Sequence, residues 1–167
     1  MKKLPAEVVQ FFQKQRFVVV STVDSANMPH NSCKGIVDID PKGKIYLLDL
    51  YRGKTLANLW HNPNISITAV DEHRFVGYCL KGKARLVDKR DLNPRIIKAW
   101  EKRIANRITY RLLKNIHEEN TKGHKRHPES VLPNPEYMIA MEVSDIVSLI
   151  PSRIWQRLKP KKRRINK

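Results

Sequence analysis

The sequence predicts a mainly β protein: a six-stranded antiparallel barrel with peripheral helices and a helical insertion before the last strand. Three observations predict this fold class. Six segments have the β-branched or alternating composition of strands, short turns separate several of them, and a long amphipathic segment lies between the fifth and the sixth. Hairpin-linked strands in this number form antiparallel barrels. The length of 167 residues fits one domain with its own core.

The first half of the chain predicts one helix and three strands. Pro5 is a favoured first helical residue, and the apolar residues at positions 8, 9, 11 and 12 supply one face of a helix over residues 5–16. Turn-forming sequences, Asp24–Asn27 and Asp40–Gly43, separate the segments rich in β-branched residues that follow. We therefore expect strands over residues 16–23, 30–39 and 44–49.

The middle of the chain predicts a second, short helix and two more strands. Leu56, Leu59 and Trp60 recur at helical spacing, and an Asn-Pro pair ends the run, which indicates a helix over residues 53–62. Strands are expected over residues 65–70 and 74–87, and a sixth over residues 137–150. Gly77 and Gly82 inside the fifth strand predict a bulge or a close backbone approach.

A helical insertion at about residues 90–120 precedes the sixth strand. Its apolar residues repeat at three- and four-residue steps, so Trp100 is expected to pack in a core. Arg103, Arg107 and Arg111 follow one another four residues apart, and we interpret them as the solvated face of the helix rather than a phosphate grip. We assign residues 1–151 to one domain and residues 152–167 to a basic C-terminal tail.

Most of the positive charge lies outside the predicted barrel. Of the formal net charge of +17, residues 88–127 carry +7 and residues 150–167 carry +8, which leaves +2 for the rest of the chain. This distribution keeps open a nucleic-acid-binding module on a barrel scaffold. However, no aromatic platform alternates with the basic residues on the strands, which disfavours that alternative. The tail alone predicts weak polyanion binding.

The cysteines and histidines predict neither disulfides nor a metal site. Two cysteines do not form a disulfide framework, so a cytoplasmic location is expected. A lone Cys in a strand is most often a small unreactive residue, and we interpret Cys33 in this way rather than as a redox thiol. His124 and His127 lie in a polar stretch without further ligands at metal-binding spacing. No segment has the apolar length of a membrane span or a signal peptide.

One junction has the composition of a phosphate-binding site. Arg52, Lys54 and Thr55 stand where the third strand gives way to the short helix. A helix start presents free N–H groups and a positive dipole end, to which these residues add two charges and a hydroxyl. From the residues alone, an ordinary polar loop with two solvated cations is an equal alternative.

The ordered set of segments from Phe17 to Val87 resembles the FMN-binding split-β-barrel family, the pyridoxamine 5'-phosphate oxidase-like superfamily. The residues that carry the resemblance are the sequence FVVVSTVD, the Met-Pro-His that opens the second strand, KGKIYLLD, and the element K-T-x-x-N-L-x-x-N-P followed by ISITAVD. The stretch Tyr137–Pro151 resembles the closing strand of that fold. The resemblance covers about two-thirds of the chain.

The resemblance implies FMN bound at the interface of a homodimer. It places the polar segment of the second strand along the isoalloxazine edge, with Asp49 and Leu50 near the ring or the ribityl chain. It implies that Arg52, Lys54 and Thr55 bind the phosphate. The second-strand residues that it assigns to the cofactor are Asn31, Ser32, Cys33, Lys34 and Gly35.

The function that the resemblance implies is an FMN-dependent oxidoreductase or electron carrier, reduced by NAD(P)H or a protein donor. Pyridoxamine phosphate oxidases often have Arg where Ser32 and Gly53 stand and Gln about where Gly77 stands. These departures argue against pyridoxamine phosphate as the substrate and leave the substrate open. Some relatives bind haem or a deazaflavin, so either group remains an alternative to FMN.

Overall fold

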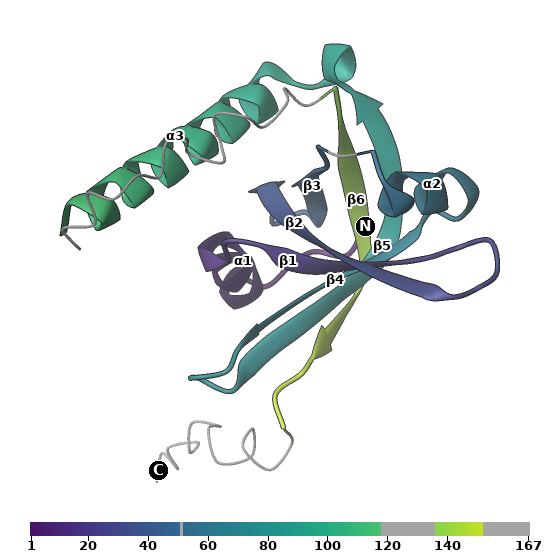
Figure 1. Cartoon of the computed structure of the whole chain (residues 1–167). Coiled ribbons are helices and arrows are strands. Elements are labelled where there is room, and N and C mark those ends of the chain that lie inside the picture. The colour runs from purple at the N-terminus through teal and green to yellow at the C-terminus, as the bar shows by residue number, and fades with distance from the viewer. Residues whose placement is uncertain (51, 118–135, 152–167) are drawn as a thin grey trace, which may run out of the picture.

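The computed structural model describes residues 1–50, 52–117 and 136–151, without the side chains of residues 107, 108 and 110–117. The described residues form a closed barrel of six antiparallel strands with three α-helices around it (Figure 1). The strands follow the order β1-β2-β3-β6-β5-β4 around the barrel. The predicted fold class is therefore confirmed. The elements are α1 (Ala6–Lys14), β1 (Val18–Val23), β2 (Pro29–Ile39), β3 (Lys44–Leu48), α2 (Lys54–His61), β4 (Asn64–Asp71), β5 (Val76–Asp88), η1 (Lys89–Asp91), α3 (Pro94–His117) and β6 (Tyr137–Ser148).

The predicted elements are all present, and they differ from the observed ones by a few residues at their ends. The first strand begins at Val18 rather than at residue 16, and the fifth begins at Val76 rather than at residue 74. Phe75 explains the second difference, because its φ of 51° belongs to a turn and not to a strand. The helical insertion is confirmed as η1 and α3.

The main core fills the barrel and the contact with α1. Val20, Ile36, Leu47, Ile67 and Leu80 are almost completely buried and come from five different strands. Alternation along each strand directs every second side chain inward, which explains the strand patterns seen in the sequence. In Figure 1, α1 and α2 lie on opposite sides of the barrel.

A second, smaller core lies on the outer face of the barrel beneath the first turns of α3. Val37 and Met138 belong to it, and Trp100 packs against it from the helix. The expectation that Trp100 is a core residue is confirmed, although its indole Nε1 has no hydrogen-bond acceptor among the described residues. From this contact, α3 extends away from the barrel (Figure 1).

Gly82 allows a close approach of two backbones in the barrel. The pairing of β5 with β6 shifts register between Lys81 and Gly82, and a Cβ on Gly82 would lie 2.0 Å from the carbonyl oxygen of Glu142. The predicted bulge is therefore confirmed at this glycine. A Cβ added to Gly77 would lie 3.2 Å from Ala69 O, which is closer than an ordinary van der Waals contact.

Several sequence interpretations fall outside the described residues. These are the side chains of Arg107 and Arg111, the pair His124 and His127, and the basic tail 152–167. Within the described part of the chain, no helix is long and apolar enough to cross a membrane.

Candidate functional site

Alternation along β2 divides the predicted cofactor residues between two faces of the barrel. Ile36 points into the core, so Ser32 and Lys34 share its inward direction. Cys33 and Gly35 face outward with Asn31. The side chain of Cys33 is exposed, because its position in the alternation places it on the outer face.

The inward-facing residues form a polar layer at the end of the barrel that α2 covers. Lys34 Nζ lies 2.7 Å from Asp49 Oδ1, and the two side chains are only 9% and 3% exposed. The hydroxyl of Tyr137 donates to the other oxygen of Asp49 at 2.7 Å. The buried carboxylate is thus satisfied by one cation and one neutral donor, as a buried charge requires. Tyr137 was missed by the sequence analysis as a site residue, since it was seen only as the start of a strand.

Burial and the bond to Asp49 raise the pKa of Tyr137 well above its ordinary value of 10.0. Burial acts because it disfavours the phenolate, and the carboxylate acts because a second negative charge beside it would be repelled. Arg52 acts in the opposite direction but does not outweigh them. Tyr137 is therefore a neutral hydrogen-bond donor at any physiological pH.

Two hydrogen bonds hold α2 against the barrel. Ser32 Oγ and Thr55 Oγ1 lie 2.9 Å apart, and the Asn58 amide donates to Thr22 Oγ1 at 2.9 Å. Thr22, Thr55 and Asn58 are buried. The Thr and Asn of the K-T-x-x-N-L element therefore fix the helix to β1 and β2, and this places the helix start directly after the loop that follows β3.

The helix start is open to solvent. Lys54 is the first residue of α2 and is exposed, and its ammonium has no ion-pair partner in the described part of the chain. Gly53 precedes it, and a Cβ on Gly53 would have no atom within 4 Å. The first N–H groups of a helix have no partner within it, so an anion can approach the backbone here. The predicted phosphate junction thus has an accessible cation and an uncovered helix end.

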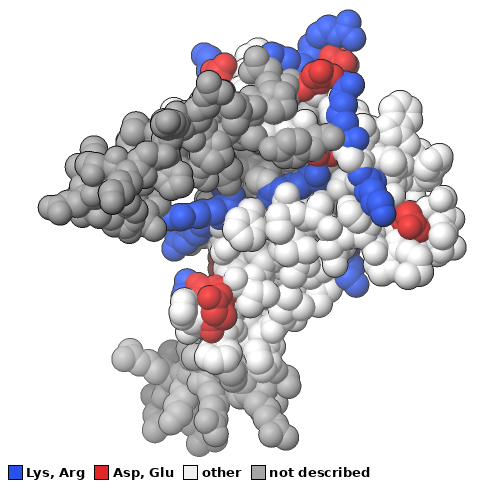
Figure 2. Space-filling model, in the orientation of Figure 1, with Lys and Arg blue, Asp and Glu red and all other residues white. Residues whose placement is uncertain are grey.

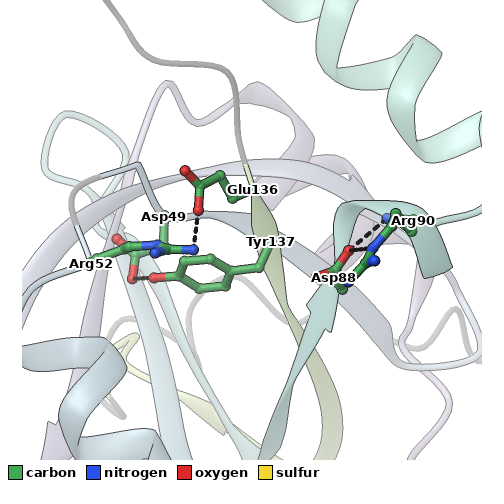
Figure 3. Close-up of polar contacts among 6 residues, drawn as sticks. All are labelled: Asp49, Arg52, Asp88, Arg90, Glu136 and Tyr137. Atoms are coloured by element: carbon green, nitrogen blue, oxygen red, sulfur yellow. Dashed lines mark hydrogen bonds and ion pairs between the residues drawn. The ribbon is translucent and has the colours of Figure 1, made fainter.

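Arg52, which was expected to bind the phosphate, is paired with a carboxylate of the protein itself. Its guanidinium forms an ion pair with Glu136 and lies over the ring of Tyr137, 6.0 Å from the ring centroid (Figure 3). Its backbone adopts a φ of 45°, in the left-handed region. Leu50, also assigned to the cofactor, lies half-buried in the same loop. The structure therefore places Arg52 beside the site but engaged with Glu136, a residue that the sequence analysis did not select.

A small cavity of about 20 Å³ lies on the outer face of β2 and β3. This cavity, between these strands and α3, is lined by Gly35, Val37, Leu48 and Trp100. A Cβ on Gly35 would have no atom within 4 Å, so the strand has open space in front of it here. Arg103 also lines the cavity and donates to the carbonyl oxygen of Gln15 at 3.0 Å. The expectation that Arg103 is simply solvated is wrong, since it is half-buried.

On the face of the molecule shown in Figure 2, basic and acidic side chains are interspersed. In the described part of the chain, no three His, Cys, Asp or Glu side chains are grouped as a metal site would require.

Residues 4–132 match the family described as pyridoxamine 5'-phosphate oxidase. The chain belongs to this family. No protein of curated function matches the chain.

Solved structures agree with the family at the level of the fold. HupZ of Group A Streptococcus is 18% identical, with a TM-score of 0.61 over 88% of this chain and 95% of HupZ. General stress protein 26 of Bacillus anthracis is 18% identical, with a TM-score of 0.54 over 87% of this chain and 93% of its own. HutZ of Vibrio cholerae, a haem storage protein, is 17% identical, with a TM-score of 0.50 over 87% and 94%. At identities this low, the comparisons show a shared fold, and the ligand has to be inferred from the residues of the site.

Proposed function

We propose that this member of the pyridoxamine 5'-phosphate oxidase family is an FMN-binding flavoprotein that serves as an oxidoreductase or electron carrier. The observation that carries the proposal is the open start of α2, where Lys54 has no ion-pair partner in the described chain and Gly53 leaves the backbone uncovered. A phosphate monoester suits such a helix start, because it is a dianion with several hydrogen-bond acceptors.

The phosphate and the ring of the cofactor bind to two different surfaces of the protein. Lys54 and the first N–H groups of α2 bind the phosphate, while Thr55 fixes the helix through Ser32. The outer face of β2, with Asn31, Cys33 and Gly35, receives the ring. Bound FMN would supply hydride or single-electron transfer, and the protein positions it. Lys34 acts indirectly, because its ammonium is engaged by Asp49 and thereby fixes the loop after β3.

A second copy of the chain covers the cofactor in this proposal. Phe17, Val19 and Val70 are 58%, 37% and 55% exposed and line one groove, which we call the apolar surface. Val19 pairs directly with Cys33, so the apolar surface is continuous with the outward-facing cofactor residues. Exposed apolar patches of this kind mark interfaces.

The bound flavin would be reduced by NAD(P)H or by a protein donor. The two cysteines are free, which agrees with a location in the reducing cytoplasm.

Haem is the second candidate, because HutZ, a structural relative, is a haem storage protein. The absorption spectrum of the purified protein distinguishes the two, since flavin and haem have different chromophores. Flavin bands, or uptake of added FMN by a colourless preparation, support the proposal. A haem spectrum together with failure to bind FMN would overturn it.

The phosphate site is tested by comparing FMN with riboflavin, which lacks the phosphate. We expect Lys54→Ala to weaken FMN binding about tenfold, as for loss of one charge-assisted hydrogen bond, and to leave riboflavin binding unchanged. Lys42→Ala in the β2–β3 turn is the matched control, since it removes an exposed charge far from α2. Equal affinities of the wild-type protein for FMN and riboflavin would remove the phosphate site from the proposal.

A further inference from the structure

We propose that the Arg52–Glu136 ion pair is an autoinhibitory contact at the phosphate site. In this inference, which rests on the proposed function, the carboxylate of Glu136 occupies the guanidinium of Arg52 until the phosphate of the ligand displaces it. Glu136 thereby lowers the affinity for the phosphate without touching the ligand.

Arg52 is held away from an ordinary loop conformation. Its φ of 45° lies in the left-handed region, which residues other than Gly and Asn rarely adopt. Its guanidinium contacts the carboxylate of Glu136 on one side and the face of the Tyr137 ring on the other (Figure 3). Two contacts from the start of β6 therefore determine where this arginine points.

Glu136 stands on a backbone that is fixed from two directions. The Lys89 N–H donates to the carbonyl oxygen of Glu136 at 2.8 Å. The next residue, Tyr137, pairs with Asp88 in the β5–β6 ladder and bonds through its hydroxyl to Asp49. Arg52 lies in the loop between β3 and α2, and the two side chains are similarly exposed, at 60% and 66%. The backbone of Glu136 is therefore fixed, while the exposed side chains of the pair are free to separate.

A phosphate monoester is able to break this pair. The pair is exposed, with 60% and 66% of the two side chains accessible, and exposed pairs are weak. A phosphate carries about −1.5 to −2 charges and three acceptor oxygens, against one charge on a carboxylate. Arg52 also lies only two residues before Lys54, so both cations serve the same ligand group once the pair opens.

The inference is tested with Glu136→Gln, which removes the charge and keeps the shape. Glu142→Gln is the matched control, because it removes an exposed charge from β6, the strand that Glu136 precedes, at a position away from the site. Titrations use FMN, riboflavin and inorganic phosphate, and the Nε–Hε NMR signal of Arg52 reports its engagement. We expect Glu136→Gln to shift this signal in the ligand-free protein and to tighten FMN and phosphate binding about two- to fivefold, with riboflavin unchanged.

The outcomes separate this inference from the proposed function. Unchanged FMN and phosphate affinities in Glu136→Gln, or the same gain in Glu142→Gln, overturn the autoinhibitory contact. A wild-type protein that binds phosphate at Arg52 but neither flavin overturns the proposed function, and the phosphate titration then decides the inference alone. If phosphate and FMN both leave the Arg52 signal of the wild-type protein unmoved, the inference is also overturned.

Discussion

At the scale of single residues, the buried group of Lys34, Asp49 and Tyr137 is the most consequential feature of the molecule. Three polar side chains lie together at one end of the barrel, and each has a partner at 2.7 Å. A buried ion pair is often no more stabilising than apolar packing, but removal of one partner is strongly destabilising because it leaves a buried charge uncompensated. This group therefore holds the loop that leads to the helix start.

Removal of the Tyr137 hydroxyl tests the strength of this group. Tyr137→Phe keeps the ring beneath Arg52 but takes one donor from the Asp49 carboxylate. We expect the free energy of unfolding at neutral pH to fall by about 1.5–3 kcal/mol, as for hydrogen bonds to charged groups. Urea denaturation measures this change, and Lys2→Met is the control, because its pair with Asp145 is exposed and should matter little. A loss no larger than that of Lys2→Met would contradict the assignment.

Because the pKa of Tyr137 is raised, the difference in unfolding free energy between wild type and Tyr137→Phe should depend on pH, and its sign can be derived. Above the ordinary value of 10.0 the unfolded chain releases the phenolic proton while the folded protein retains it. The folded state then binds more protons, so stability due to this group is full below that pH and is lost as the pH rises above it. The difference in unfolding free energy between wild type and Tyr137→Phe should therefore shrink in alkaline solution. A constant difference would show that the folded pKa is ordinary.

At the scale of elements, the β5–β6 ladder is the longest pairing in the barrel and depends on one glycine. The ladder runs from Tyr78 and Ser148 to Asp88 and Tyr137 and shifts its register before Gly82. The missing Cβ of Gly82 lets the Glu142 carbonyl approach. Because Glu136 and Tyr137 lie at one end of this ladder, its register also fixes the candidate site.

Two alanine substitutions should separate a required glycine from an optional one. Gly82→Ala places a methyl group 2.0 Å from a backbone oxygen, so we expect a loss of about 1–3 kcal/mol in unfolding free energy. Gly35→Ala, with no atom within 4 Å, should fold with unchanged or slightly higher stability. Thermal and urea unfolding compare the two proteins. Equal stability of both would mean that the bulge relaxes freely around a side chain.

At the scale of the whole molecule, the barrel leaves the apolar surface of Phe17, Val19 and Val70 facing solvent. A single exposed apolar side chain needs no explanation, but three that line one groove indicate an interface. The surface adjoins the outward residues of β2 through the pairing of Val19 with Cys33. A second copy seated here would come close to any ligand on the outer face of β2.

A charge on this surface should therefore dissociate the protein. We expect sedimentation equilibrium to give about twice the chain mass of 19.5 kDa for the wild type and the single mass for Val19→Glu, because a carboxylate cannot be buried unpaired. FMN binding should weaken in parallel. Met28→Glu is the control, since Met28 is also exposed but lies in the turn between β1 and β2. A wild-type protein that is monomeric at all concentrations would contradict the proposed assembly.

The sequence by itself determined the elements of this protein and part of its site. Alternation, turn residues and helical spacing act over a few neighbouring residues, so they are readable from the chain, and the bulge at Gly82 and the start of α2 were predicted in this way. Lys34 and Asp49 were both selected, and they meet because β2 and β3 form a hairpin.

Only the tertiary structure decided which way those side chains face and which distant residues join them. Ser32 and Lys34 point inward and Cys33 outward, a choice that depends on which face of β2 meets the core. Tyr137 reaches Asp49 across 88 residues of sequence, and Glu136 reaches Arg52 beside it, because barrel closure pairs β3 with β6. Such pairings are determined by the packing of the whole barrel, which no local sequence pattern records.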